Sequence, residues 1–143
     1  MGVKQISVFL ENKAGRLAEV TDVLGKAGIN LRALSIAETA DYGVLRLIVD
    51  KPEEALRTLK ENGFTASETE VLVVEVPDRP GGLAGILKLL APKGINVEYM
   101  YAFVEKSGDN ALVVFRVEEP ERVARILREA GVKLLSGEEV YRL

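Results

Sequence analysis

Residues 15–18 read GRLA and lead to GIN at residues 28–30. The same arrangement returns as GGLA at residues 81–84, followed by GIN at residues 94–96. The second copy lies 66 residues after the first, from 15 to 81. A repeat of this length indicates two small domains of one fold, with equivalent sites in register.

A second pair of markers extends the repeat. PE at residues 52–53 returns as PE at residues 120–121, now 68 residues later, from 52 to 120. Because the spacing grows from 66 to 68, we expect two extra residues in a turn at 105–109. The duplication predicts one domain over residues 1–68 and another over residues 69–143.

The periodicity of apolar residues predicts the same order of elements in both halves: strand, helix, strand, strand, helix, strand. In the first half we expect strands over 3–10, 31–38, 44–50 and 64–67, and helices over 17–27 and 52–62. In the second half we expect strands over 71–76, 97–105, 111–118 and 132–135, and helices over 82–93 and 120–130. Pro92 should weaken or end its helix. Residues 139–143 alternate enough for an extra strand.

This βαββαβ order predicts an α+β fold of two tandem ferredoxin-like domains. Each has an antiparallel sheet with both helices on one face. The second sheet is apolar on both faces, for example at Val71, Val73, Leu112 and Val114. A face that no helix covers should be polar. We therefore expect the first repeat or another chain to cover this face or an edge of the sheet.

Composition excludes several classes of function. The 143 residues are 48% hydrophobic and 29% charged, which is typical of a soluble globular chain. A net charge of −3 argues against nucleic acid as a partner. No apolar run could span a membrane and no signal peptide is evident, so we expect a cytoplasmic protein with no membrane partner.

The sequence contains no cysteine and no histidine. Thiolate nucleophiles, the usual zinc sites and the commonest general base are therefore excluded. Carboxylates or lysine could still serve an enzyme, but no acid–base cluster converges. We expect no catalytic residues, no bound metal and no cofactor, and hence a protein that is not an enzyme.

Two loops are candidate ligand sites, at residues 12–17 and 78–83. Each follows a strand and opens a helix, and helix N-termini bind carboxylates or phosphates. The loop glycines would let a ligand approach the backbone, and the side-chain oxygens of Asn12 and Asp78 could accept from an ammonium group. The alternative is helix capping, for which Asn and Asp are favoured. Recurrence of the loop favours ligand binding.

Further candidates lie beyond each first helix. Asn30 and Asn96 lead into the second strand of each half, although a turn role after the helix is the simpler explanation for these two residues alone. A period of two places four bulky side chains on one side of the strand at 97–103. They are Val97, Tyr99, Tyr101 and Phe103, and the corresponding residues of the first half are the smaller set Leu31, Ala33, Ser35 and Ala37. This difference could shape an apolar pocket, or the aromatic residues could belong to a core or an interface.

The stretch DRPGGLA at residues 78–84, together with GINV at 94–97, resembles the ACT domain. NKAGRLA at residues 12–18, with GINL at 28–31, is a weaker copy because it lacks the proline and carries Arg16 in place of the second glycine. The resemblance covers the whole chain as two tandem ACT domains.

The resemblance implies a regulatory module that binds an amino acid at an interface between paired ACT domains. The implied ligand-binding residues are Asn12, Gly15, Leu17 and Asn30 in the first half, and Asp78, Gly81, Gly82, Leu83 and Asn96 in the second. It also implies a homodimer and a separate target, an enzyme of amino-acid metabolism. The alternative is a structural or interaction subunit without a small-molecule ligand.

Overall fold

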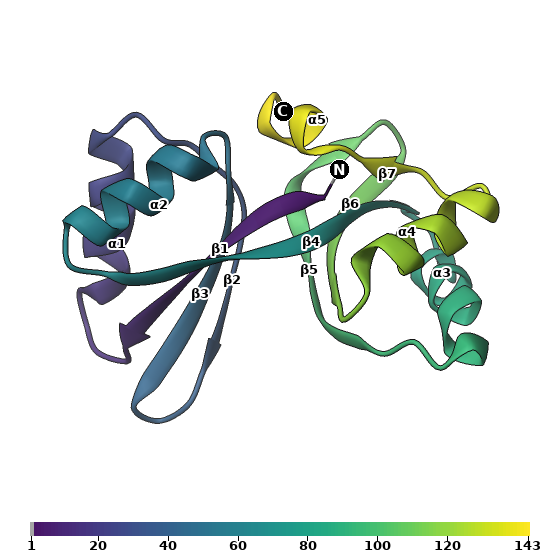
Figure 1. Ribbon diagram of the computed structural model, residues 1–143, viewed down its shortest axis with the longest axis horizontal. Helices are drawn as coiled ribbons and strands as arrows, with labels where there is room; N and C mark the ends of the chain where they lie inside the picture. The colour runs from purple at the N-terminus through teal and green to yellow at the C-terminus, as the bar shows by residue number, and fades with distance from the viewer. Residues whose placement is uncertain (1) are drawn as a thin grey trace. The chain divides into compact units, whose positions relative to one another are not determined.

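The structure is a computed structural model that describes residues 2–143, apart from the side chains of residues 104–107. The chain forms two compact units (Figure 1). The N-terminal unit consists of Lys4–Thr69 together with Tyr141–Leu143. The C-terminal unit consists of Glu70–Val140 together with Gly2 and Val3.

The N-terminal unit is an antiparallel sheet with two helices packed on one face. Its elements are β1 (Val3–Glu11), α1 (Arg16–Lys26), β2 (Leu31–Glu38), β3 (Tyr42–Val49), α2 (Pro52–Glu61) and the start of β4 (Thr65–Pro77). Strand β3 lies between β1 and β2, and β1 also pairs with β4. The core joins buried residues of both helices to the sheet: Val20, Leu24, Ala55 and Leu59 with Ile6, Val8, Leu45 and Leu47.

The C-terminal unit repeats this arrangement. After the rest of β4 come α3 (Gly82–Leu90), a 3-10 turn (Ala91–Lys93), β5 (Val97–Ser107), β6 (Asn110–Val117), α4 (Pro120–Glu129), β7 (Leu134–Leu135) and α5 (Gly137–Tyr141). The strand order is β5-β6-β4-β7, with antiparallel pairs. As expected, the α-helix ends at Leu90 and the chain continues as the 3-10 turn that contains Pro92.

Strand β4 corrects one expectation. It is a single strand of 13 residues, where we expected separate strands over 64–67 and 71–76. The sequence between these two segments contains neither glycine nor proline, so nothing interrupts the extended backbone. The two units therefore share one strand, and the change of unit falls between Thr69 and Glu70.

The two extra residues of the second half are also misplaced in our prediction. Strand β5 continues to Ser107, and the hairpin turn is only Gly108–Asp109. The pairing of β5 with β6 shifts between Ala102 and Lys106, which face Val113 and Ala111. Four residues along β5 thus correspond to two residues along β6. The two extra residues are accommodated by an irregularity within β5 and not in the turn.

A second irregularity corrects the expected side-chain stripe on β5. Val97 pairs with Val117 of the core, whereas Tyr99 pairs with Arg116. Two residues along β5 therefore correspond to only one residue along β6. The shift turns Val97 toward the helices and leaves Tyr99 and Tyr101 on the opposite face. The same shift occurs in β2 between Leu31 and Ala33. The predicted alternation of side chains therefore fails at the start of both β2 and β5. The same irregularity is present in both copies of the repeat.

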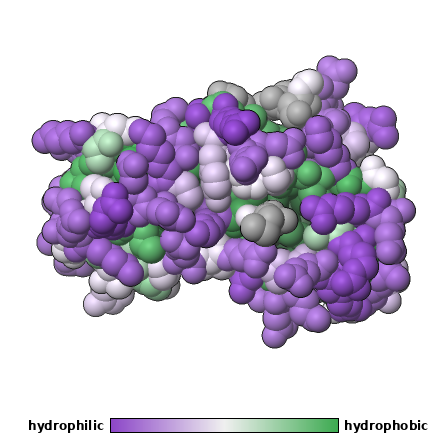
Figure 2. Space-filling view, turned by 45° about the horizontal axis from the view of Figure 1, so that its top comes forward, coloured by the Kyte–Doolittle hydropathy of each residue, from purple (hydrophilic) through white to green (hydrophobic). Residues whose placement is uncertain are grey.

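The apolar residues that the sequence places on the helix-free face of the C-terminal sheet are buried. Val71, Val73, Leu112 and Val114 are each 0% exposed. The visible surface in Figure 2 is mainly hydrophilic, with small apolar patches between hydrophilic residues. Among the side chains that the structure describes, the large apolar residues that remain exposed are Phe9, Leu17, Leu34, Ile36, Tyr42 and Met100.

The expected strand over 139–143 is wrong, because this segment belongs largely to α5. Ser136 N donates to Glu139 Oε1 at 3.0 Å, and Glu139 N donates to Ser136 Oγ at 3.2 Å. This reciprocal pair is a capping box, which satisfies two backbone donors at a helix start. The sequence SGEE at residues 136–139 carries its signature, whereas five alternating residues are weak evidence for a strand.

The capping box predicts a pH dependence for α5. The backbone hydrogen bond from Ser136 is the largest cause that lowers the pKa of the Glu139 carboxyl below its ordinary value. A lowered pKa in the folded state means that this contact stabilises the protein above the ordinary glutamate pKa. The stabilisation is lost as the pH falls through the folded-state pKa. Carboxyl NMR titration should give a lower midpoint for Glu139 in the native protein than in urea; equal midpoints would contradict the prediction.

Candidate functional site

The two predicted loops have the same backbone hydrogen bonds. Lys13 N donates to Glu11 O at 2.9 Å, and Arg79 N donates to Pro77 O at 2.9 Å. Each bond closes a tight turn directly after the strand, so the following residues enter the helix in the same way. The sequence repeat is therefore also a repeat of loop geometry.

Each loop ends in a glycine that forms the N-cap of its helix. Gly15 has φ 91° and Gly81 has φ 83°, both in the left-handed region that favours glycine. The capping role considered for Asn12 and Asp78 is wrong, because these residues lie three positions before the N-cap. Asn12 Nδ2 instead donates to the carbonyl oxygens of Thr39 and Ala40, at 3.2 and 3.3 Å.

In the C-terminal unit the loop borders a pocket of about 340 Å³, referred to below as the α3 pocket. Its walls come from the end of β4, the start of α3 and the segment between α4 and β7. Polar and charged lining residues are Glu75, Arg79, Asn110 and Lys133; glycines are Gly81, Gly82, Gly85 and Gly131; apolar residues are Pro77, Ile86, Leu89 and Val132. The pocket thus combines both signs of charge with an apolar wall.

Glu75 is the buried charged residue of this pocket, with a side chain only 8% exposed. Asn110 Nδ2 donates to Glu75 Oε1 at 3.0 Å. Lys133 Nζ lies 3.3 Å from Glu75 Oε2, yet this buried oxygen has no hydrogen-bond partner. The ammonium therefore compensates the charge by proximity, without the alignment of a hydrogen bond. A buried carboxylate oxygen without a hydrogen bond is costly, and a further donor would stabilise it.

Gly82 allows the loop to close against β4. A Cβ atom at this position would overlap the carbonyl oxygen of Pro77. The N-terminal unit carries Arg16 at the equivalent position, where Nη1 pairs with Glu19 Oε2 at 2.8 Å and the guanidinium lies 5.4 Å from the centre of the Phe64 ring. The two loops share their backbone but differ in the space beside the helix start.

The structure brings only some predicted residues of the second half together. Gly81 and Gly82 line the α3 pocket, whereas Asn96 lines a separate pocket of about 120 Å³. Leu83 is half-buried and packs against the core, and Asp78 is exposed. Asp78, Leu83 and Asn96 do not line the α3 pocket, and their role in ligand binding stays a prediction.

In the first half, the predicted residues are exposed and make mainly structural contacts. Asn30 N donates to Asp50 Oδ1 at 2.9 Å, and Asp50 N donates to Asn30 O at 3.1 Å, as a turn role requires. Leu17 is 46% exposed, and Gly15 is exposed as well. Ligand binding by Asn12, Gly15, Leu17 and Asn30 stays a prediction.

Sequence reasoning missed four polar residues of the α3 pocket: Glu75, Arg79, Asn110 and Lys133. For Glu75 a signal was available, because a single acidic residue interrupts the apolar run VLVVEV at residues 71–76. An acid in a strand that reads as buried requires a partner or a function. The other three come from separate loops and strands, and only the fold brings them together.

A profile of ACT domain pairs matches residues 1–143. The chain belongs to the ACT domain pair family. Protein BT0572 from Bacteroides thetaiotaomicron has a crystal structure similar to this ACT pair, with a TM-score of 0.93 and 45% identity over 100% of this chain and 98% of that one. The regulatory subunit of aspartate kinase from Thermus thermophilus shares the fold, with a TM-score of 0.64 and 22% identity over 91% of this chain and 93% of that one.

A curated relative of this ACT pair is the probable acetolactate synthase small subunit of Archaeoglobus fulgidus. It is 22% identical over 149 aligned positions, which cover 92% of this chain and 89% of the relative. The family assignment and the antiparallel α+β architecture together confirm the predicted resemblance to ACT domains. Across the described residues, no helix is long and apolar enough to cross a membrane.

Proposed function

We propose that this ACT domain pair is a non-catalytic regulatory module that binds a free amino acid in the α3 pocket and acts on a separate target protein. The observation that carries the proposal is that the start of α3, Arg79 and the apolar residues Ile86 and Leu89 line one pocket of about 340 Å³. An amino acid needs an anion site, a cation site and an apolar wall. This pocket offers an anion site and an apolar wall, and Glu75 is the acidic residue among its lining residues.

The ligand carboxylate would lie at the start of α3, where the helix dipole and the N–H groups favour negative charge. Arg79 and Lys133 add positive charge at the pocket wall. The ligand side chain would contact Ile86 and Leu89.

We further propose that a neighbouring ACT domain from a second copy of the chain encloses the ligand. Micromolar binding requires about −8 kcal/mol. A ligand of about ten heavy atoms supplies this only with high efficiency per atom, which favours an enclosed site. Two copies of the chain, each with domains over 1–68 and 69–143, would then form a homodimer. The bound ligand would favour one arrangement of its domains.

The target we propose is an enzyme of amino-acid metabolism. The named relatives are a regulatory subunit of aspartate kinase and a probable small subunit of acetolactate synthase. Both names describe subunits of such enzymes rather than complete enzymes. A ligand-dependent change in the arrangement of ACT domains would be passed to the target through direct binding.

Thermal unfolding against each of the twenty amino acids at millimolar concentration tests this function. A ligand at 100 times its dissociation constant stabilises the native state by about 2.7 kcal/mol, which raises the melting temperature measurably. We expect a shift for a small subset of amino acids, and loss of that shift in Arg79→Met. Lys88→Met, an exposed change on α3 outside the pocket, should keep it.

A structural subunit without a ligand is the second candidate. The contacts of Asn12 with the β2–β3 turn favour it for the N-terminal unit, because they give that loop a structural role. If none of the twenty amino acids changes the melting temperature, the structural role replaces the regulatory one.

A further inference from the structure

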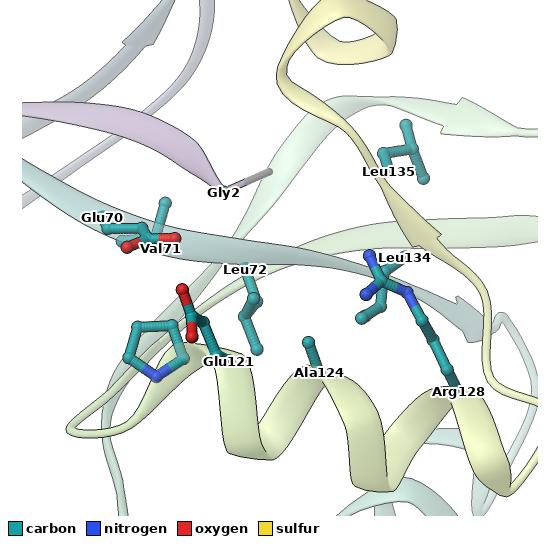
Figure 3. A pocket seen from close by; sticks show the side chains of 10 residues that line it. Gly2, Glu70, Val71, Leu72, Glu121, Ala124, Arg128, Leu134 and Leu135 are labelled. Carbon is teal, nitrogen blue, oxygen red and sulfur yellow. The ribbon is translucent and has the colours of Figure 1, made fainter.

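A second pocket of the C-terminal unit has a volume of about 380 Å³ and lies beside α4 (Figure 3). We call it the α4 pocket. Leu72 of β4, Ala124 of α4 and Leu134 of β7 provide its apolar floor. It shares no lining residue with the α3 pocket.

The charged side chains of the α4 pocket are separated by sign. Glu121 and Arg128 lie on the same face of α4, two turns apart, with Ala124 between them. At about 1.5 Å per residue, these seven steps separate the two backbone positions by about 10 Å. Glu70, from β4, adds a second carboxylate near the Glu121 end, while the Arg128 guanidinium lies at the other end, as Figure 3 shows.

In the part of the chain that the structure describes, no ion pair involves the side chain of Glu70, Glu121 or Arg128. Other charges of the same unit are paired: Arg122 lies 3.6 Å from Glu119, and Lys133 lies 3.3 Å from Glu75. The three side chains of the α4 pocket are therefore available to a ligand, with an apolar floor between opposite charges.

We propose that the α4 pocket binds a small zwitterion whose ammonium and carboxylate groups stand at the two ends of a short hydrocarbon chain. Arg128 binds the carboxylate, and a guanidinium suits that role because its fork of donors matches a carboxylate. Glu70 and Glu121 bind the ammonium. The hydrocarbon chain covers Leu72 and Ala124, which removes apolar surface from water.

The pattern of charge excludes simpler ligands from this role. A monocarboxylate would leave two carboxylates of the protein without a cation, and a monoamine would leave Arg128 without an anion. A ligand with both groups close together, such as glycine, cannot reach both ends of the pocket. The site thus favours ω-amino acids and amino acids with a long cationic side chain over short ones.

Isothermal titration calorimetry with 6-aminohexanoate tests the proposal, with hexanoate, hexylamine and glycine as matched controls. We expect saturable binding of 6-aminohexanoate, and each control should bind at least about fivefold more weakly because it loses one charge contact. Added salt should weaken the binding, because the charged groups are exposed. Absence of saturable binding, or equal binding of hexylamine, would overturn the proposal.

Variants inside and outside the α4 pocket test whether 6-aminohexanoate binds there. Glu121→Gln and Arg128→Met should each weaken 6-aminohexanoate binding about fivefold. Arg125→Met, an exposed change on α4 outside the pocket, should leave it unchanged. Arg79→Met, which tests the α3 pocket, should also leave it unchanged, so the two proposals can fail independently. Unchanged binding in both Glu121→Gln and Arg128→Met would reject the site.

Discussion

Gly82→Ala is expected to lower the free energy of unfolding by about 3 kcal/mol. The added Cβ atom would overlap the carbonyl oxygen of Pro77, and a backbone atom cannot move aside as a flexible side chain can. Gly82 is buried at the first position of α3, so relief of the overlap requires the helix start to shift away from β4. Urea unfolding should show a lower midpoint with an unchanged slope.

The same substitution should also disturb the α3 pocket, because Gly82 lines it. We expect the melting-temperature response to amino acids to be weakened together with stability. For stability, Gly85→Ala is the matched control, since it adds the same atom to the same helix with nothing within 4 Å of the new Cβ. Gly85 also lines the α3 pocket, so this variant is not a control for the response to amino acids. Alanine is favoured over glycine inside a helix, so this variant should gain up to about 1 kcal/mol. Equal stability of the two variants would refute the steric argument.

Much of the fold could be predicted because the sequence pattern of most elements occurs twice, once in each half. Strand β2 has the predicted bounds, and α2 and α4 begin at the predicted prolines. The errors arise where local pattern and tertiary context disagree. No local signal marks the end of one domain within β4, and the irregularity near Val97 reverses an alternation that sequence alone reads as regular.

The candidate site was less predictable than the fold. The helix-start glycines carry a local signal, because a turn and a close approach to backbone require them. Asn110 and Lys133 carry none, since they reach Glu75 only through strand pairing and the segment before β7. Asn96 was grouped with the glycine loop by sequence, yet it lines a separate pocket. Proximity between distant segments is a property of the packed chain.

Phe115→Ala should cost about 4 kcal/mol, the largest loss of stability we expect from a single substitution. Phe115 is 0% exposed in the middle of β6, where it faces Leu72 and Met100 on the neighbouring strands. Truncation removes the ring from the core and leaves a cavity that the surrounding helices fill only in part. Urea unfolding of the purified variant measures this loss directly.

The duplication supplies the control for this substitution. Position 115 corresponds to Leu47 in the first half (115 minus 68), and Leu47 is also 0% exposed. Phe115→Leu therefore introduces the side chain that the same fold already accommodates at the equivalent position, and it should cost only about 1 kcal/mol. If Phe115→Leu is as destabilising as Phe115→Ala, the cost arises from the shape of the ring, and the two cores are not interchangeable. A small cost for both would mean that the core of the C-terminal unit does not depend on this side chain.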